Sequence, residues 1–592
     1  MRILMVTNVY SPQVIGGAEI IVRRHARCLA ELGHDVAIIA GWLPGFAGQE
    51  QELDVVDGLR VYRFPFRTWE QSEDFWIPAI EGFVDAVVAQ ECPDLVHAHN
   101  LRGLGVNLIA AVRRRGLPVF VTLHDHWFHC HWATRLRSDG TQCTDPRACD
   151  LGCCPGVVAD GVPDKRLPVR LRRDTLLRAL DGAHCLIAPS ESLGRAYEQA
   201  GIVPRRLRIV SNGMDLDALP PMPVRRASAS DGVVRFALAA SLAEHKGIHD
   251  LIEATALLHG DPALRGRWQL TVAGTGQLQG DLEAAIASGR LGEGVNYVGQ
   301  LDRADVHSLM AASDVVVLTS RWPENEPVVL LEGAAVGAAL IATDVGGCPE
   351  MIHPGRSGEL VPPRDPMALA GAMAAYVRAP ALAALHGSWN ADHRDRLDEA
   401  YTIAILLEQY AMAIKTPAPV AKRPPMVVCG GLPTPGTVSL VSRFHLVEPE
   451  GFRLRLLWQG WTHPEDWQEA AFYWDWGGRP EMRERALLAG LPVLAAEDGT
   501  RAPGVVPYRS LLEVAAALVD WPRDRSLLSS LRRPNEARLR EFWRDAGPAP
   551  AALQDIPLES AAIGDDLARR AEALARQHPV FATALAQMES SL

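Results

Sequence analysis

Short apolar runs recur along this chain, and most are followed by a turn and a segment with helical spacing. The first run, residues 2–7, precedes an amphipathic segment at residues 17–32 that stops at Gly33, and a second run follows at residues 35–40. A strand, a helix and a second strand in this order form a parallel pair. Repetition of this unit builds a parallel sheet with helices on both faces, so the chain is predicted to be an α/β protein.

The units form two groups, separated by a segment rich in proline, serine and alanine at residues 220–230. In the first group, further strands are expected at residues 95–97, 119–123 and 185–188. In the second, strands are expected at residues 234–239, 269–273, 295–298, 315–318 and 339–343, with helices at 248–258 and 278–287 among them. We predict two α/β domains, residues 1–204 and 205–385.

A linker at residues 415–425, with four prolines in eleven residues, precedes a third region at residues 426–592. Segment 482–499 of this region resembles segment 331–347 of the second domain, which predicts a partial copy, a degenerate Rossmann-like half, before a helical pattern at 556–592. The tryptophans of the region either fill the core of that half or form a platform that stacks on carbohydrate. They include Trp458, Trp461, Trp467, Trp474 and Trp476.

Composition excludes several classes of protein. The 592 residues carry a formal net charge of −12 and are 48% hydrophobic, which argues against a disordered chain and against a nucleic-acid scaffold. No run of 18 apolar residues predicts a membrane span, and the N-terminal run lacks the length and cleavage site of a signal peptide. Ten cysteines are too few for a secreted disulfide scaffold of this length, so a cytoplasmic location is expected.

Two loops of the first domain carry candidate binding groups. In VIGGAE, the pair Gly16 and Gly17 would let backbone N–H groups approach an anion at a helix N-terminus, although a tight strand–helix turn explains the pair equally well. The pattern is not GxGxxG, so a dinucleotide site is not indicated. In TLHDH, His124 follows a buried strand, where ligands of open α/β sheets bind, and Asp125 could orient it; a structural histidine is the alternative.

Three charged residues of the second domain are further candidates. Lys246 in SLAEHKG precedes a predicted helix and could neutralise a phosphate there, unless it is simply solvated. Glu324 and Glu332 bracket seven residues, and Pro327 between them fits the first turn of a helix and not its interior. Glu324 is therefore expected in the loop before the helix and Glu332 on the helix, with free N–H groups at residues 328–330 between them; two unrelated acids at a capped helix start are the alternative. A glycine-rich loop, DVGGCPE, follows the next strand.

These motifs occur in a familiar order along the chain. VIGGAE, GHDV, TLHD, APSE, SNGMD, HKG, GTG, VGQL, the Glu-x7-Glu pair and DVGG together resemble the retaining glycosyltransferases of family 4 over residues 1–410. The resemblance implies a GT-B fold, with two facing Rossmann-like domains, a cleft between them and helices at 386–414 that return to the first domain. It also implies transfer of a sugar from a nucleotide-sugar donor to a hydroxyl acceptor, such as an envelope glycan or a lipid-linked saccharide. Nucleic acid is not an expected partner, whereas peripheral contact with the inner face of a membrane is.

The resemblance assigns roles by position. Glu332 would hold the ribose hydroxyls of the nucleotide, and Glu324 would lie near the donor sugar. Lys246 would bind the diphosphate, and His124 would lie near the reacting carbon of the sugar. Lys246 and a helix N-terminus would stabilise the leaving diphosphate without a metal, and no protein nucleophile or other cofactor is expected. His124, Lys246 and Glu324 are thus the predicted catalytic residues. The predicted donor-binding residues are Gly16, Gly17, Ser241, Asn325, Val328, Val329 and Glu332.

One position departs from the family pattern. Many members carry an arginine five residues before the lysine, where this chain has Ser241. Either another arginine replaces it, with Arg321 as the candidate, or activity is low, so a non-catalytic nucleotide-sugar- or glycan-binding protein stays open. An epimerase or a phosphorylase on the same fold is a further alternative.

A cysteine cluster follows the TLHDH motif, in an insert expected at about residues 126–165 of the acceptor-side domain. Some family members carry a similar insert. In a reducing compartment four thiolates could hold a structural zinc ion, although a loop of free thiols fits the unpaired spacing as well. The predicted ligands are Cys130, Cys143, Cys149 and Cys153, with His126, His129 and His131 as alternatives.

Overall fold

The structure is a computed structural model, and it divides the chain into two compact units that are described separately. Met1–Cys154 with Thr175–Ala421 form the first unit, and Pro155–Asp174 with Lys422–Leu592 form the second. The described residues are 1–14, 16–42, 53–65, 77–137, 139–145, 173, 176–220, 232–415, 426–430, 453–457, 470–475, 493–496, 505–508, 513, 517, 568–573 and 575–576.

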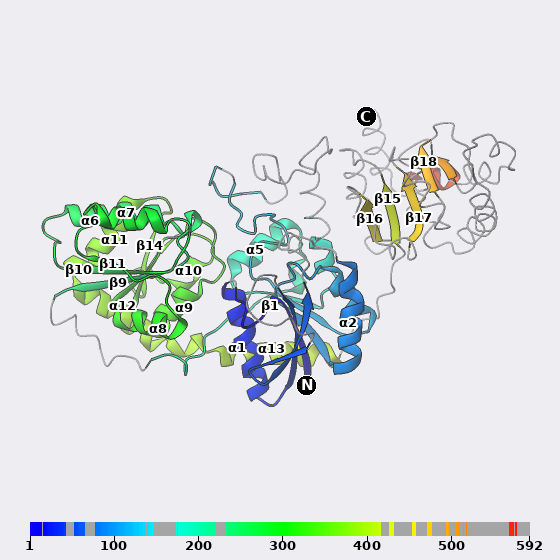
Figure 1. The fold of residues 1–592 in the computed structure, drawn as a ribbon, viewed down its shortest axis with the longest axis horizontal. Helices are drawn as coiled ribbons and strands as arrows, with labels where there is room; N and C mark the ends of the chain where they lie inside the picture. Colours follow the sequence, from blue (N-terminus) through cyan, green and yellow to red (C-terminus); the bar gives the residue numbers. More distant parts are fainter. Residues whose placement is uncertain are drawn as a thin grey trace. The chain divides into compact units, whose positions relative to one another are not determined.

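The first lobe of the first unit is built on an eight-stranded sheet with the order β3-β4-β2-β1-β5-β6-β7-β8 (Figure 1). Neighbouring strands are parallel except for the β3–β4 hairpin. The central strands are buried along their whole length on both faces, as expected for a parallel sheet between helices. The strands are β1 (Arg2–Val9), β2 (Asp35–Trp42), β3 (Leu53–Val56), β4 (Leu59–Pro65), β5 (Leu95–Ala98), β6 (Val119–Thr122), β7 (Cys185–Ala188) and β8 (Leu207–Ile209).

Two helices of this lobe start at residues that cap them. In α1 (Gly17–Glu31) the carboxylate of Glu19 reaches back to the backbone N–H of Gly16, with Oε2 2.7 Å from the nitrogen. In α5 (Glu191–Ala200) the hydroxyl of Ser190 accepts from the N–H of Leu193. The other helices here are α2 (Pro78–Glu91), α3 (Asn107–Arg114) and the short 3-10 helix η2 (Pro204–Arg206).

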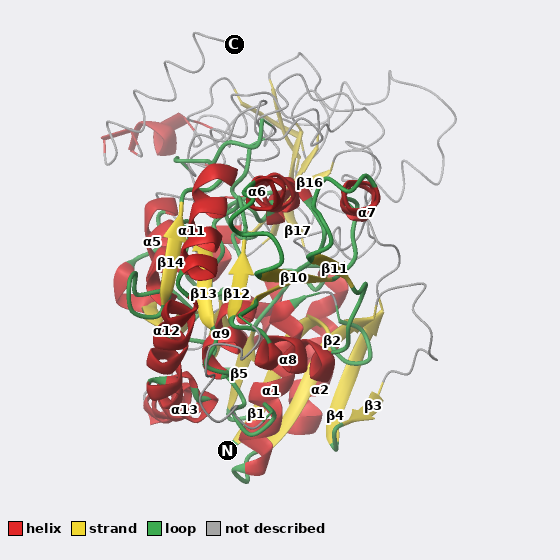
Figure 2. Cartoon of the chain, turned by 90° about the vertical axis from the view of Figure 1, so that its left-hand side faces the viewer, coloured by secondary structure: helices red, strands yellow, loops and turns green. Residues whose placement is uncertain are grey.

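The second lobe has a six-stranded parallel sheet with the order β11-β10-β9-β12-β13-β14. Helices α6, α7 and α11 cover one face, and α8, α9 and α12 cover the other (Figures 1 and 2). The strands are β9 (Val234–Ala239), β10 (Trp268–Ala273), β11 (Val295–Tyr297), β12 (Val315–Leu318), β13 (Ala339–Thr343) and β14 (Gly358–Val361). The helices are η3 (Glu244–Lys246), α6 (Ile248–Gly260), α7 (Gln279–Ala287), α8 (Arg303–Ala312), α9 (Val328–Ala335), α10 (Cys348–Met351), α11 (Pro366–Arg378) and α12 (Pro380–Asp392).

The last helix of the first unit returns to the first lobe. After η4 (Arg394–Leu397), α13 (Glu399–Lys415) packs beside α1, and its buried residues Ile403, Leu406 and Tyr410 belong to a core of the first lobe. The expected returning helices at 386–414 are therefore present in this part of the chain.

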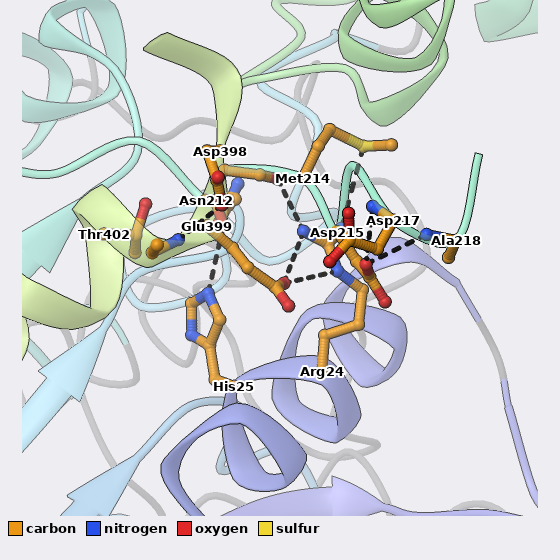
Figure 3. A network of polar contacts seen from close by, with 12 residues as sticks. Arg24, His25, Asn212, Met214, Asp215, Asp217, Ala218, Asp398, Glu399 and Thr402 are labelled. Atoms are coloured by element: carbon orange, nitrogen blue, oxygen red, sulfur yellow. Dashed lines mark hydrogen bonds and ion pairs between the residues drawn. The ribbon is translucent and has the colours of Figure 1, made fainter. Parts of the chain in front are cut away.

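The interlobe connection is the segment between β8 and β9, residues 210–233. A polar network joins its first residues to α1 and α13 (Figure 3). Arg24 on α1 donates to Glu399 and to the carbonyl of Gly213, each at 2.8 Å. His25 contacts the carbonyl of Asn212 at 3.0 Å. Gly213 has φ +66°, and a Cβ there would lie 2.6 Å from Cα of Glu399, so the close approach of the connection to α13 requires glycine.

The second unit contains a five-stranded parallel sheet with the order β16-β15-β17-β18-β19. Its strands are β15 (Met426–Gly430), β16 (Arg453–Leu457), β17 (Ala470–Asp475), β18 (Val493–Ala496) and β19 (Val505–Tyr508). A parallel sheet agrees with the α/β class predicted for this region. The structure does not describe the side chains of the five tryptophans. Both roles considered for them, core residues or a carbohydrate platform, therefore stay predictions.

The expected strands are present, with small differences in extent. β1 and β2 run two residues further than predicted, to Val9 and Trp42, and the first sheet continues through β8, past the boundary expected at residue 204. The β3–β4 pair and β14 were not predicted from the sequence. Within the described residues no single helix is long and apolar enough to cross a membrane; the pair α11 and α12, bent by 98°, passes that test only when taken together.

Candidate active site

The loops after β9 and β12 bring Lys246 and Glu324 together. Nζ of Lys246 lies 2.5 Å from Oε1 of Glu324 and 4.9 Å from the ring centroid of Trp322. Gly247, at φ +69°, makes this approach possible, because a Cβ there would meet the carbonyl oxygen of Thr319 at 1.9 Å. Two of the three predicted catalytic residues therefore form a direct ion pair at the carboxyl ends of adjacent strands.

Glu324 is held by more than Lys246. Its Oε1 also accepts from the hydroxyl of Ser320 at 2.5 Å and from the indole N–H of Trp322 at 2.6 Å. The side chain is buried, so these three donors replace the water that an isolated carboxylate would need. The sequence pointed to Glu324 but not to Ser320 or Trp322.

Glu332 lies on α9, one turn inside the helix, as predicted. Its carboxylate is buried and contacts Nη2 of Arg303 at 2.8 Å and Nε2 of His307 at 3.1 Å. Both partners come from α8, a helix with no recognisable motif, which is why the sequence did not reveal them. Val328 and Val329 form the first turn of α9, directly after Pro327.

The first lobe contributes the third predicted catalytic residue. His124 follows β6, and its carbonyl oxygen accepts from Nδ2 of Asn325 at 2.6 Å. Gly17 also faces α9, since a Cβ on it would lie 3.6 Å from Cγ2 of Val328. The structure thus brings Gly17 and His124 of the first lobe to Val328 and Asn325, at or just before the start of α9.

A second interlobe contact was not predicted from the sequence. Glu350, in the DVGGCPE loop of the second lobe, accepts from the backbone N–H groups of Glu191 and Ser192, each at 2.7 Å. These groups form the N-terminus of α5 in the first lobe, where a carboxylate is favoured by the helix dipole.

His124 belongs to a group of histidines. Its Nε2 lies 2.9 Å from Nδ1 of His99, and the two rings stack at 5.2 Å. Burial lowers the pKa of His124 to about 3, so its imidazole is neutral at physiological pH. The motif VHAHN at the end of β5 is the signal that could have drawn attention to His99.

Arg321, the candidate to replace the family arginine, already contacts carboxylates of its own lobe. Ser241 is exposed in the loop after β9. Arg321 is held by Asp250, with Nε–Oδ2 at 2.7 Å and Nη2–Oδ1 at 2.6 Å, and it also contacts Glu244. Two carboxylates thus bind the guanidinium of Arg321, and its role as the replacement for the family arginine stays a prediction.

The proposed zinc site lies largely beyond the described residues. Cys130 is buried and Cys143 is partly buried, whereas Cys149 and Cys153 fall outside the described set. No group of three or more histidine, cysteine or acidic side chains suited to a metal occurs within the described part of the chain. A structural zinc ion therefore stays a prediction.

Two family models match the two lobes. The model described as Glycosyltransferase Family 4 matches residues 15–218, and the model described as Glycosyl transferases group 1 matches residues 226–392. The chain belongs to the group 1 glycosyltransferases of family 4. Residues 426–592 lie outside both matches, so the family assignment describes the first unit.

Curated and solved relatives agree with this assignment. A glycogen synthase of Mycobacterium tuberculosis is 29% identical over 391 residues, which are 65% of this chain and 87% of that protein. Sucrose-phosphate synthase from Thermosynechococcus elongatus matches with a TM-score of 0.53 and 20% identity, over 70% of this chain and 99% of that one. HepE of Anabaena, in complex with UDP and glucose, matches with a TM-score of 0.50 and 21% identity, over 70% of this chain and 100% of that one. The glycosyltransferase lobes therefore have the GT-B fold.

Proposed function

We propose that this chain is a retaining glycosyltransferase that moves a sugar from a nucleotide donor to a hydroxyl group, in the synthesis of a cell-surface polysaccharide or glycoconjugate. The observation that carries the proposal is the pair Lys246–Glu324 at the ends of β9 and β12, next to the start of α9. A cation beside free helix N–H groups suits a diphosphate, and a carboxylate beside it suits sugar hydroxyls. Contact between Asn325 and His124 brings the first lobe to the same place.

The proposed chemistry needs no metal. As the bond between the sugar carbon and the phosphate oxygen breaks, negative charge grows on the diphosphate, where Lys246 and the α9 N-terminus stabilise it. The acceptor oxygen bonds to the same face of the carbon and passes its proton to the leaving phosphate oxygen. Glu332 holds the ribose, Glu324 the donor sugar, and His124 lies near the reacting carbon of that sugar.

The acceptor is proposed from relatives alone. One curated relative is named glycogen synthase, so a growing polysaccharide is the first acceptor class to test. Transfer to a lipid-linked saccharide would place the chain at the inner face of a membrane.

A thermal-shift panel with UDP-, GDP- and ADP-glucose tests the proposal on wild type, Glu332→Gln and Glu253→Gln. Glu253 is a matched control, because it pairs with Arg290 on the surface of the same lobe. A ligand at about 100 times its Kd stabilises a protein by about 2.7 kcal/mol. One donor should stabilise wild type and Glu253→Gln but not Glu332→Gln. If no nucleotide sugar stabilises wild type, the proposal fails.

The exposed Ser241 and the engaged Arg321 favour one alternative, a protein that binds nucleotide sugar without transferring it. Release of nucleoside diphosphate distinguishes the two functions. A donor that stabilises wild type but is never cleaved, with or without glycan acceptors, would support the alternative.

A further inference from the structure

Four histidines of the first lobe lie close together beside the proposed donor site. His97 and His99 are on or just after β5, His124 follows β6, and His25 lies on α1. The ring of His99 is central, with centroids 4.2 Å from His97, 5.2 Å from His124 and 6.2 Å from His25. His99 is buried, whereas His124 is partly exposed. A ligand could reach His124 but not His99.

The hydrogen bonds form an ordered series. Tyr410 on α13 contacts Nδ1 of His97 at 2.5 Å, and Nε2 of His97 contacts the hydroxyl of Thr122 at 2.8 Å. His99 uses Nδ1 to contact Nε2 of His124 at 2.9 Å. The other nitrogen of His99, Nε2, is buried and has no hydrogen-bond partner within the described residues.

This asymmetry decides where the proton of His99 resides. Burial lowers the pKa of both His99 and His124, so each neutral ring carries one N–H. A proton on Nε2 of His99 would be a buried N–H without an acceptor, and orphaned N–H groups are rarer in folded proteins than orphaned acceptors, such as the bare Nε2 of the other tautomer. On Nδ1 the same proton is donated to Nε2 of His124. His124 must then carry its own proton on Nδ1.

We propose that His99 is a positioning residue that fixes His124 as the Nδ1–H tautomer. Nε2 of His124 is occupied by this hydrogen bond, so the ring meets the substrate as a donor through Nδ1 and not as a base. A sugar hydroxyl or a phosphate oxygen is the chemical class it would bind. The inference deepens the proposed function, because it assumes that His124 faces the donor.

Asparagine and glutamine at position 99 test the geometry. The amide of asparagine reaches about the place of Nδ1, and the amide of glutamine about the place of Nε2. His99→Asn should therefore retain kcat within about threefold, whereas His99→Gln should lose tenfold or more in kcat with little change in the KM of the donor. The matched control is His386→Gln in the second lobe, where a buried histidine contacts Tyr376 through Nδ1 at 2.8 Å. It should leave kcat unchanged. Equal losses in both His99 variants would overturn the proposal.

A spectroscopic measurement does not depend on enzymatic activity. It therefore tests the tautomer of His124 separately from the proposed function. Long-range 1H–15N spectra of the 15N-histidine-labelled full chain report which ring nitrogen is protonated, with His124 assigned by its loss in His124→Asn. A protonated Nδ1 on His124 supports the inference, and a protonated Nε2 overturns it. Failure of the proposed function would appear instead as absence of donor turnover.

An independent observation concerns the second unit. In the second lobe, Leu340 on β13 pairs with Val316 on β12 and with Gly358 on β14. In the second unit, Val493 on β18 pairs with Tyr473 on β17 and with Val505 on β19. The order β16-β15-β17-β18-β19 equals the order of the second lobe with its edge strand β11 removed, and β2-β1-β5-β6-β7 of the first lobe follow it too, so the sequence decides which lobe is copied.

The resemblance of segment 482–499 to segment 331–347 matches Gly337 with Gly490 and therefore Leu340 with Val493. Glu332 lies eight residues before Leu340, and the residue eight before Val493 is Arg485. The segment that joins β17 to Pro480 reads WGGR and contains no carboxylate, whereas the corresponding loop of the second lobe contains Glu324. Residues 431–442, which follow β15, contain no lysine or arginine to match Lys246.

We infer that residues 426–592 contain a second copy of the nucleotide-sugar lobe without its donor-binding groups, so that the chain holds one nucleotide-sugar site. Calorimetric titration of the full chain with UDP, GDP and ADP tests this. One site per chain that disappears in Glu332→Gln supports the inference. Two sites, or one that survives in Glu332→Gln, overturn it. Absence of any binding would contradict the proposed function, whereas two sites or a surviving site would contradict this inference alone.

Discussion

Lys246 and Glu324 are 78 residues apart in the chain, yet Nζ and Oε1 lie 2.5 Å apart. Their side chains are 18% and 7% exposed, so most of their hydration is replaced by this contact and by the hydroxyl and indole donors on Glu324. The ammonium is therefore neutralised from within the protein. A diphosphate that binds Lys246 would share the ammonium with Glu324. The position of the Glu324 carboxylate would then change when the diphosphate binds.

Replacement of Lys246 should impair both turnover and stability. We expect Lys246→Met to lower kcat about 10²–10³-fold, since it removes a cation from the leaving diphosphate. It should also cost about 1–3 kcal/mol of folding stability, because Glu324 keeps only neutral donors. Lys246→Arg should restore part of the rate, and Lys415→Met, an exposed lysine at the end of α13, is the control. Steady-state kinetics and urea unfolding provide the readouts, and an unchanged kcat would exclude Lys246 from the chemistry.

Introducing the family arginine at Ser241 should strengthen donor binding. The loop position is exposed and Arg321 is engaged with Asp250, so Ser241→Arg adds a cation near Lys246 without breaking a contact. A screened charge interaction of about 1 kcal/mol would tighten nucleoside diphosphate binding about fivefold, with a smaller gain at high salt. Calorimetry measures it, and Ser288→Arg, an exposed site after α7, should have no effect. Weaker binding in Ser241→Arg would show that position 241 does not face the diphosphate.

The fold and part of the site were predictable from the sequence for physical reasons. Buried parallel strands are continuous apolar runs, and Pro327 marks the start of α9 by its chemistry, which correctly separated Glu324 from Glu332. The contacts of Glu332 with Arg303 and of His124 with His99 depend on which distant elements pack together, and no local pattern encodes that. The contacts of Arg321 with Asp250 and Glu244 were hidden for the same reason. Its charge is visible in the sequence, but the nearby carboxylates that bind it are not.

The contact of Glu350 with α5 should favour the closed arrangement of the two lobes. A carboxylate on two helix N–H groups contributes about 1–2 kcal/mol, so Glu350→Ala should shift the balance toward open forms about 5–30-fold. We expect a higher KM for the donor and faster proteolysis of the interlobe connection. Glu408→Ala, at an exposed position on α13, is the control. Identical KM values in Glu350→Ala and wild type would mean that this contact does not influence closure.

Glu326 should make stability depend on pH in a defined direction. Burial raises its pKa from 4.5 to about 7, and its Oε2 accepts from the backbone N–H of Asn212 at 2.6 Å. Between pH 4.5 and pH 7, Glu326 is protonated in the folded chain but ionised in the unfolded chain. The contribution of Glu326 is therefore fully present below pH 4.5 and is lost as pH rises to 7. The total change is about 3 kcal/mol.

Glu326→Gln isolates this effect from that of the histidines, whose lowered pKa values act in the opposite direction. Burial lowers the pKa of His25 to about 4, so protonation of the unfolded chain destabilises the fold as pH falls through 6.5. Glutamine retains a carbonyl acceptor for Asn212 but does not titrate. The stability of Glu326→Gln relative to wild type should therefore increase between pH 5 and pH 8, as measured by urea midpoints, whereas that of Glu253→Gln should not. A difference that stays constant across this range would mean that Glu326 is already ionised in the folded chain at pH 5.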